Sequence, residues 1–239
     1  MNVVLVTRSC VFSRYLAASL YSAGSLDAVI VETGRPSWTF LRRKLSRVGP
    51  ANAVFQVAFN RWFRMEGSRH LPNLPLPPHR SLRNVNSYPF AAQDVVIGFG
   101  TSFITAATLA RMANGFLNLH TGWLPEYRGV KSEFWTLAAG DCANVGWTLH
   151  YMTPRLDDGD IVLRRKVPYE GENPPQLRAK LLREAVPIIA EFTQRVRSAG
   201  PSSIERFPQG EGRYHTTPTW SDWRRYRARR RASPSGRAD

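Results

Sequence analysis

Residues 95–120 read VVIGFGTSFITAATLARMANGFLNLH, and this stretch decides the fold. Residues 95–100 form a continuous apolar run, which is typical of a strand that is covered on both faces. A short helix is expected near Thr105–Met112, and FLNLH at 116–120 predicts the next strand. A strand, a helix and a strand in this order form one parallel pair of a sheet.

The flanking sequence extends the same pattern. Two β-branched runs near the N-terminus enclose a stretch with helical spacing, and further strands and helices follow residue 130. The expected strands are 3–6, 28–31, 146–152 and 161–166, and the expected helices are 12–24, 131–139 and 175–198. The sequence therefore predicts an open, mostly parallel, Rossmann-like α/β sheet.

Two segments fall outside this pattern. Residues 36–90 form an insertion whose first part, 38–64, predicts a basic amphipathic helix. Such a helix either packs its apolar face on the core or lies on an anionic membrane, and both interpretations stay open. The proline-rich residues 71–80 predict a surface loop or arm. Accordingly, we expect a catalytic domain over residues 1–200 and a C-terminal extension over 201–239.

The net charge of +15 comes mostly from arginine, because only four of the 33 basic residues are lysine. Residues 223–239 hold seven arginines and one aspartate, which predicts a solvated, poorly ordered tail. Contact of this tail with RNA, membrane phosphates or an acidic partner is the alternative. Without a long apolar stretch or a signal peptide, a cytoplasmic protein is expected. Cys10 and Cys142 lack metal-type spacing, so reduced thiols and no metal site are expected.

Polar residues interrupt the sheet where ligands bind in open α/β folds, at the carboxyl ends of the strands. By strand alternation, Asn118 and His120 point to one side, and RLDDGD at 155–160 follows the strand at 146–152. An Asn amide can donate to a developing oxyanion, and a His titrates near neutral pH. An Asp can hold the imidazole charged and oriented. No Ser or Cys lies in a nucleophile elbow, so covalent catalysis is not indicated.

Four ordered motifs resemble formyltransferases that use 10-formyltetrahydrofolate. They are N-x-H at 118–120, L-P-x-x-R-G at 124–129, G-x-T-x-H at 146–150 and L-D-x-G at 156–159. The resemblance is specific over about residues 94–168 and looser before them. It implies formyl transfer from 10-formyltetrahydrofolate, a co-substrate, to an amine, without a metal.

The resemblance also implies roles for residues. It makes Asn118, His120 and Asp157 the catalytic residues. It implies folate binding by Ser102, Phe103, Ile104, Arg155 and Asp158. The loop with Pro125, Tyr127, Arg128 and Gly129 is expected to shape the acceptor side, and Thr148 and His150 to support the site, although a purely structural His150 is an equal alternative.

The acceptor is a separate question. The turn TRSCVFS at 7–13 lacks the glycines that hold the substrate phosphate in glycinamide ribonucleotide formyltransferases. Few residues follow the last long helix, which disfavours methionyl-tRNA and leaves nucleic acid a weak candidate. By analogy, the YRGVKSEFW and YHTTPTW segments indicate a small amine, above all a nucleotide-linked amino sugar, with surplus arginines for its diphosphate. A non-catalytic RNA- or membrane-associated protein is the alternative, and a homodimer through the insertion helix stays open.

Overall fold

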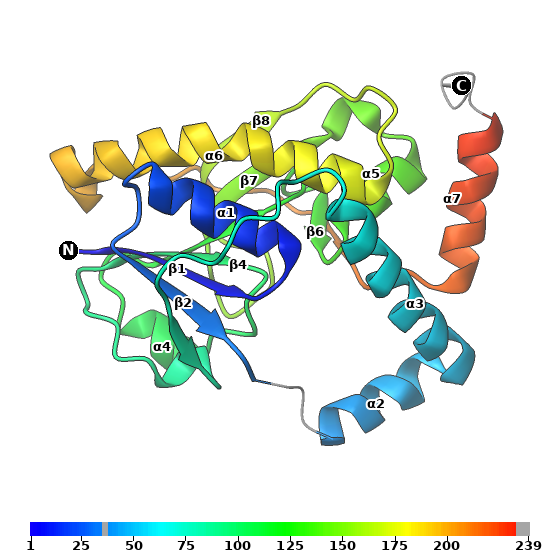
Figure 1. Cartoon of the computed structure of the whole chain (residues 1–239), viewed down its shortest axis with the longest axis horizontal. Coiled ribbons are helices and arrows are strands. Elements are labelled where there is room, and N and C mark those ends of the chain that lie inside the picture. Colours follow the sequence, from blue (N-terminus) through cyan, green and yellow to red (C-terminus); the bar gives the residue numbers. More distant parts are fainter. Residues whose placement is uncertain (35–37, 233–239) are drawn as a thin grey trace.

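The computed structural model describes residues 1–34 and 38–232. Its centre is a seven-stranded sheet with the strand order β3-β2-β1-β4-β5-β7-β8 (Figure 1). The strands are β1 (Val3–Arg8), β2 (Ala28–Glu32), β3 (Arg80–Leu82), β4 (Val95–Phe99), β5 (Phe116–His120), β7 (Gly146–Tyr151) and β8 (Ile161–Lys166). The first five strands of that order run parallel, β7 is antiparallel to β5, and β8 is antiparallel to β7. The predicted open, mostly parallel α/β sheet is confirmed.

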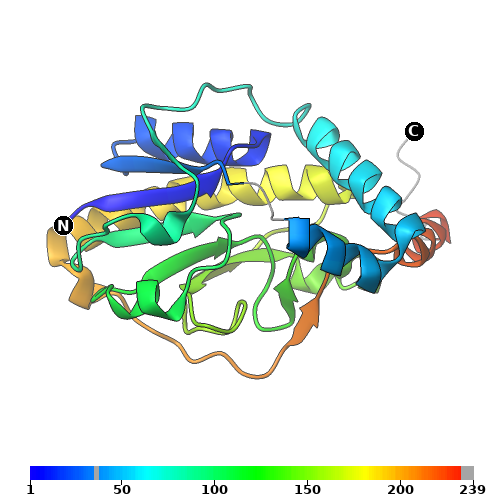
Figure 2. The ribbon, with the colours of Figure 1, turned by 90° about the horizontal axis from the view of Figure 1, so that it is seen from below.

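Both faces of the sheet are buried, because alternate side chains of β1 enter two different cores. Val3 and Leu5 belong to the larger core, and Val4 and Val6 to the smaller one. Helices α1 (Val11–Ser22) and α6 (Pro174–Ala199) cover the larger core, and the short α4 (Ala106–Ala110) lies over the smaller one (Figure 2). This two-sided cover explains why the strands read as continuous apolar runs.

The insertion contains two helices rather than the single helix expected over 38–64. Helix α2 (Trp38–Val48) ends before Gly49, whose φ of 75° leaves the helical region, and α3 (Pro50–Gly67) begins at the following proline. Proline disfavours helical geometry in the residue before it, which accounts for the break. On α2, Trp38 is 76% exposed and Leu45 48% exposed, so the core-facing interpretation fails for these two side chains. It holds for α3, where Phe59 and Phe63 are buried.

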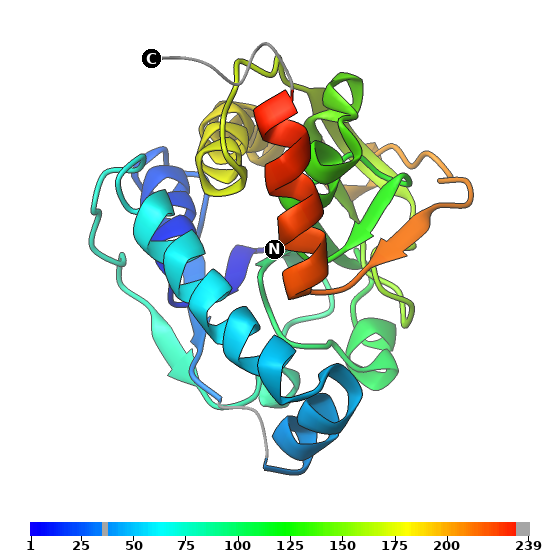
Figure 3. The same ribbon diagram turned by 90° about the vertical axis from the view of Figure 1, so that its right-hand side faces the viewer.

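The C-terminal extension is also more ordered than expected. Residues 204–217, here called the C-terminal strap, run along the outside of the sheet (Figure 2) and include β9 (Arg213–His215), which pairs in parallel with β6 (Tyr127–Gly129). The prediction of a poorly ordered tail is wrong up to residue 232. Helix α7 (Trp220–Ala232) folds beside α3 and α5 (Ser132–Ala139), as Figure 3 shows. Tyr226 of α7 is only 3% exposed and contacts the Phe134 ring.

The described part of the chain also contains the short 3-10 helices η1 (Val85–Ser87), η2 (Cys142–Asn144) and η3 (Pro201–Ser203). Cys10 and Cys142 are both free thiols. Within residues 1–34 and 38–232, no helix is long and apolar enough to cross a bilayer.

Candidate active site

A pocket of about 370 Å³ lies at the carboxyl ends of β1, β4 and β5. The pocket brings together the two predicted residues of β5, Asn118 and His120, with His150 of β7 and Asp157 of the loop before β8. Leu117 and Leu119, which alternate with the polar pair, lie in the larger core, as the alternation of the strand requires.

The carboxylate of Asp157 is the centre of the polar cluster. Its Oδ1 accepts a hydrogen bond from Asn118 Nδ2 at 3.3 Å and lies 3.4 Å from His150 Nε2. Its Oδ2 accepts from the backbone N–H of Gly129 at 2.8 Å and lies 3.6 Å from His120 Nδ1. Three separate chain segments therefore meet on one carboxylate.

The surroundings of Asp157 favour its charged form. Burial would raise the pKa of Asp157, but the charge of His120 and the contacts with His150 and Gly129 outweigh it and lower the pKa to about 2. Asp157 also has a positive φ of 50°, which is rare for a residue with a side chain. A buried residue held in this conformation needs support from the structure around it.

Both ring nitrogens of His120 face acceptor atoms. Nε2 lies 2.7 Å from the carbonyl oxygen of Tyr127 and 3.0 Å from Ser132 Oγ. Nδ1 lies 3.6 Å from the Asp157 carboxylate, which is an ion-pair distance but longer than a hydrogen bond. Since Nε2 is already bonded, Nδ1 is the nitrogen that remains available to a ligand in the pocket.

His150 contacts Asn118 and Asp157 directly, whereas Thr148 contacts the backbone of the loop after β5. His150 Nδ1 lies 2.8 Å from the carbonyl oxygen of Tyr151, and donation there leaves Nε2 to face Asn118 Nδ2 at 3.1 Å. Thr148 Oγ1 donates to the carbonyl oxygen of Gly122 and accepts from the N–H of Leu124. Thr148 thus fixes the loop that follows β5.

Four of the five residues expected to bind folate line the same pocket. Ser102 is held by Glu32, whose carboxylate accepts from the Ser102 N–H at 3.0 Å and from its Oγ. Phe103 is 58% exposed at the rim, Ile104 is buried, and Arg155 is largely exposed. These groups offer an apolar wall and backbone polar atoms, which suit a flat heterocycle.

The fifth, Asp158, pairs instead with Arg128 from the expected acceptor loop. Arg128 Nη1 lies 2.6 Å from Asp158 Oδ1, and Nη2 donates to the carbonyl oxygen of Gly210 in the strap at 2.8 Å. Neither Arg128 nor Asp158 lines the pocket, so their side chains join the loop, the strap and the Asp157 turn to one another.

The rest of the acceptor loop contributes mainly backbone atoms. The Tyr127 hydroxyl donates to Asp141 at 2.8 Å, outside the pocket, while the carbonyl oxygen of Tyr127 contacts His120. Pro125 follows a cis peptide bond and lies outside the pocket lining. Gly129 lines the pocket and presents its N–H to Asp157.

The structure adds residues that the sequence does not single out. Ser132 contacts the His120 ring, Lys131 and Arg178 line one end of the pocket, and Gln209 of the strap donates to the carbonyl oxygen of Asp157 at 3.2 Å. The position of Ser132 just after the L-P-x-x-R-G motif was a usable signal, whereas nothing in the local sequence marks Gln209. In the part of the chain that the structure describes, no cluster of His, Cys, Asp and Glu could hold a metal ion.

Comparison with known proteins points to one family. The formyl transferase family model matches residues 3–191. Methionyl-tRNA formyltransferase of Bordetella avium is 32% identical over 164 residues, which are 67% of this chain and 50% of that protein. Phosphoribosylglycinamide formyltransferase of Escherichia coli is 28% identical over 136 residues, 56% of this chain and 58% of that protein. The chain thus spans about half the length of the curated relatives it matches.

The fold also matches a solved structure, the N-formyltransferase from Helicobacter canadensis in complex with folinic acid and dTDP-3-aminofucose. The TM-score is 0.56 at 16% identity, and the match covers 90% of this chain and 71% of that one. At this identity the likeness concerns the fold.

Proposed function

Since the chain belongs to the formyl transferase family, we propose that it transfers the formyl group of 10-formyltetrahydrofolate to a primary amine of a small acceptor. The observation that carries the proposal is the convergence of Asn118, His120 and Asp157 on one pocket. An amide donor, an imidazole and a buried carboxylate are the groups that acyl transfer to an amine requires.

The proposed reaction begins with attack of the neutral amine nitrogen on the formyl carbon. The formyl oxygen becomes an oxyanion. His120 Nδ1 and one N–H of Asn118 Nδ2, which turns from His150 Nε2 to the oxyanion, stabilise it by hydrogen bonding. The bond between the formyl carbon and N10 of the folate then breaks, and the proton lost by the amine reaches N10 through His120 and water. Asp157 remains ionised, since its pKa is about 2, and holds the charge of His120 beside the reacting carbon.

We propose a nucleotide-linked amino sugar as the acceptor. The shared fold with an enzyme solved with dTDP-3-aminofucose supports this class, as does the exposed Arg155 in the pocket lining. Methionyl-tRNA is the second candidate, because a methionyl-tRNA formyltransferase is among the relatives with higher identity and α7 is rich in arginine.

The test is acceptor-dependent release of tetrahydrofolate. The protein is incubated with 10-formyltetrahydrofolate and either nucleotide-linked amino sugars, free amino sugars, amino acids or charged methionyl-tRNA. We expect turnover with the sugar nucleotides, and a loss of about 10²–10³ in rate for His120→Ala, as for other oxyanion-hole donors. His79→Ala is the matched control, because His79 is exposed and does not line the pocket. Turnover of His120→Ala within twofold of the parent protein contradicts the catalytic assignment.

A further inference from the structure

Arg8, Lys131 and Arg178 are basic side chains that line the pocket, and Lys131 and Arg178 share one end of it, where both lie over the Phe63 ring. Two of them are neutralised within the protein. Arg8 pairs with the buried Glu32 at 3.0 Å, and Arg178 makes two hydrogen bonds of 2.5 and 2.8 Å to Glu133, which is itself fully buried.

Lys131 differs from Arg8 and Arg178 because its ammonium group has no counter-ion among the described residues. Within residues 1–34 and 38–232, no carboxylate lies within 4 Å of its ammonium group, since Arg178 occupies both oxygens of the nearby Glu133. The Lys131 Nζ lies 3.8 Å from the centroid of the Phe63 ring and 5.8 Å from that of Phe59. An aromatic face offsets only part of the cost of burying an ammonium group.

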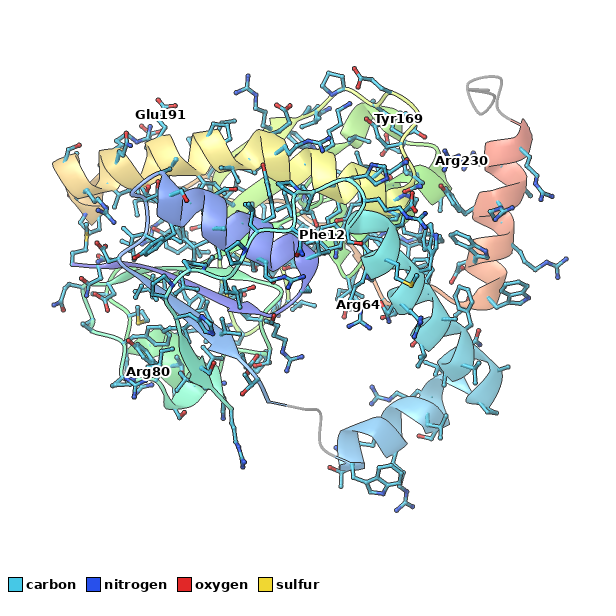
Figure 4. All side chains as sticks on the ribbon, in the orientation of Figure 1. Phe12, Arg64, Arg80, Tyr169, Glu191 and Arg230 are labelled. Carbon is cyan, nitrogen blue, oxygen red and sulfur yellow. The ribbon has the colours of Figure 1, made fainter. Side chains whose placement is uncertain are left out.

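The backbone gives Lys131 a fixed place near the reacting groups. Lys131 has a left-handed conformation, with φ 63°, and directly precedes α5. The next residue, Ser132, contacts the His120 ring at 3.0 Å. Phe12, which Figure 4 labels near the start of α1, lines the same end of the pocket. Lys131 is therefore a largely buried donor that faces the pocket beside His120.

The charges around Lys131 indicate which kind of ligand this end of the pocket can bind. The pairs Arg8–Glu32 and Arg178–Glu133 are each neutral, so a protonated Lys131 leaves one unbalanced positive charge. A buried unbalanced charge is costly unless a partner of opposite sign arrives. Burial lowers the pKa of Lys131 to about 7, Arg178 acts in the same direction, and Glu133 opposes it. An anion bound at this place would stabilise the charged form.

We propose that Lys131 binds an anionic group of the formyl acceptor, a phosphate or a carboxylate, at the end of the pocket next to His120. The inference rests on the proposed function and narrows the acceptor to amines that carry a negative charge. Lys131 then holds the acceptor so that its amine reaches the formyl carbon, and neutral amines lack this contact.

Binding is tested without turnover, by titrating the ¹⁵N-labelled protein with inorganic phosphate, inorganic pyrophosphate or acetate. The amide signals of Gly129 and Ser132 report on this end of the pocket and separate it from the arginines of α7. We expect Lys131→Met to weaken the binding of phosphate or of acetate about 10- to 100-fold, and Lys131→Arg to retain most of it. Whichever anion binds more tightly identifies phosphate or carboxylate as the group.

Lys166→Met is the control, because Lys166 is an exposed lysine that lies over the Trp123 ring, 5.0 Å from its centroid. It should bind the anions as the parent protein does. Equal affinities of the parent protein and Lys131→Met, or an absence of shifts at Gly129 and Ser132 with all three anions, overturn the proposal.

Kinetics then separate this inference from the proposed function. For an amino sugar with a phosphate or nucleoside diphosphate, Lys131→Met should weaken the apparent affinity for the acceptor, seen as a rise in its KM by about 10- to 100-fold. The turnover number and the KM for the folate co-substrate should change little. Formyl transfer with an unchanged acceptor KM overturns the anion site and leaves the proposed function intact. Anion binding that depends on Lys131, without formyl transfer to any amine, overturns the proposed function and leaves the anion site intact.

Discussion

The side-chain amide of Gln209 donates hydrogen bonds to the backbone carbonyl oxygens of Asp157, at 3.2 Å, and Gly159, at 2.5 Å. The C-terminal strap therefore fixes the turn that carries the central carboxylate of the site. Arg128 ties the same strap to the acceptor loop through the carbonyl oxygen of Gly210. The extension belongs structurally to the site, although it follows the last core helix.

Replacement of Gln209 by Ala should lower kcat about 10-fold, because Asp157 keeps its unusual backbone conformation only while its surroundings support it. The loss of stability should be small, about 1 kcal/mol, as for a typical hydrogen bond. Turnover and urea unfolding measure the two effects. Gln194→Ala is the control, since Gln194 is exposed on α6. A full kcat in Gln209→Ala would show that the turn holds its shape without the strap.

Replacement of Gly129 by Ala should disrupt the junction of the acceptor loop, the strap and Asp157. Gly129 has a φ of 97°, and an added Cβ would lie 2.1 Å from the carbonyl oxygen of His215. A backbone carbonyl cannot move away as the end of a side chain can. We therefore expect a loss of about 3 kcal/mol or more in the free energy of unfolding.

Gly24→Ala is the matched control for this prediction. Gly24 has a φ of 66°, and no atom of the described residues lies within 4 Å of an added Cβ. Gly24→Ala therefore measures the cost of the backbone conformation alone, about 1 kcal/mol. Equal losses for the two variants in urea unfolding would exclude steric conflict at Gly129.

The sequence predicts well those features that depend on local pattern. Every strand of the central sheet except β3 follows from the apolar runs, and the common direction of Asn118 and His120 follows from strand alternation. The L-D-x-G motif marks Asp157. Strand β6 escapes prediction, because its three residues pair with β9 in the strap. Helix α7 escapes it as well, because an arginine-rich helix shows no apolar stripe and packs through few residues, chiefly Trp223 and Tyr226.

The unexpected site residues depend on contacts between distant segments. A single glutamine in a loop, such as Gln209, carries no pattern that would mark it. Among the described residues Lys131 has no carboxylate partner, and Arg178 of α6 holds both oxygens of the nearby Glu133. Whether Arg178 or Lys131 pairs with Glu133 depends on the tertiary structure, so a sequence motif cannot predict it.

Asp157→Asn should change how the stability depends on pH. The pKa of Asp157 is about 2 in the folded protein and 3.8 as the reference value, so the unfolded chain binds more protons in between. The carboxylate therefore stabilises the fold fully above about pH 4 and loses this effect as the pH falls toward 2. The stability difference between parent protein and Asp157→Asn should shrink by about 2 kcal/mol from neutral pH to about pH 2.

Urea unfolding of both proteins in the same buffers measures this difference. The comparison cancels carboxylates that both proteins share, including Glu66 and Glu172, whose pKa values are also lowered. A difference that stays constant with pH contradicts a low pKa of Asp157.

Lys131→Met should stabilise the protein at neutral pH, even though it removes the proposed anion contact. The pKa of Lys131 is about 7 in the folded protein against a reference value of 10.5. Between these values the unfolded chain binds more protons, so the stability of the parent protein rises with pH there, and the penalty is largest below pH 7. Methionine fills a similar space without a charge and loses the cation–π contacts with the Phe63 and Phe59 rings.

We therefore expect Lys131→Met to gain about 2 to 4 kcal/mol in the free energy of unfolding near pH 6, and the gain to shrink toward about pH 10. Urea unfolding across this range measures it, with Lys166→Met, at an exposed lysine, as the variant that should show no such gain. Lower stability of Lys131→Met at pH 6 would mean that the ammonium group is stabilised within the folded protein. A gain instead means that the fold bears a cost at Lys131 that a bound anion would relieve, because binding to the folded state alone stabilises it.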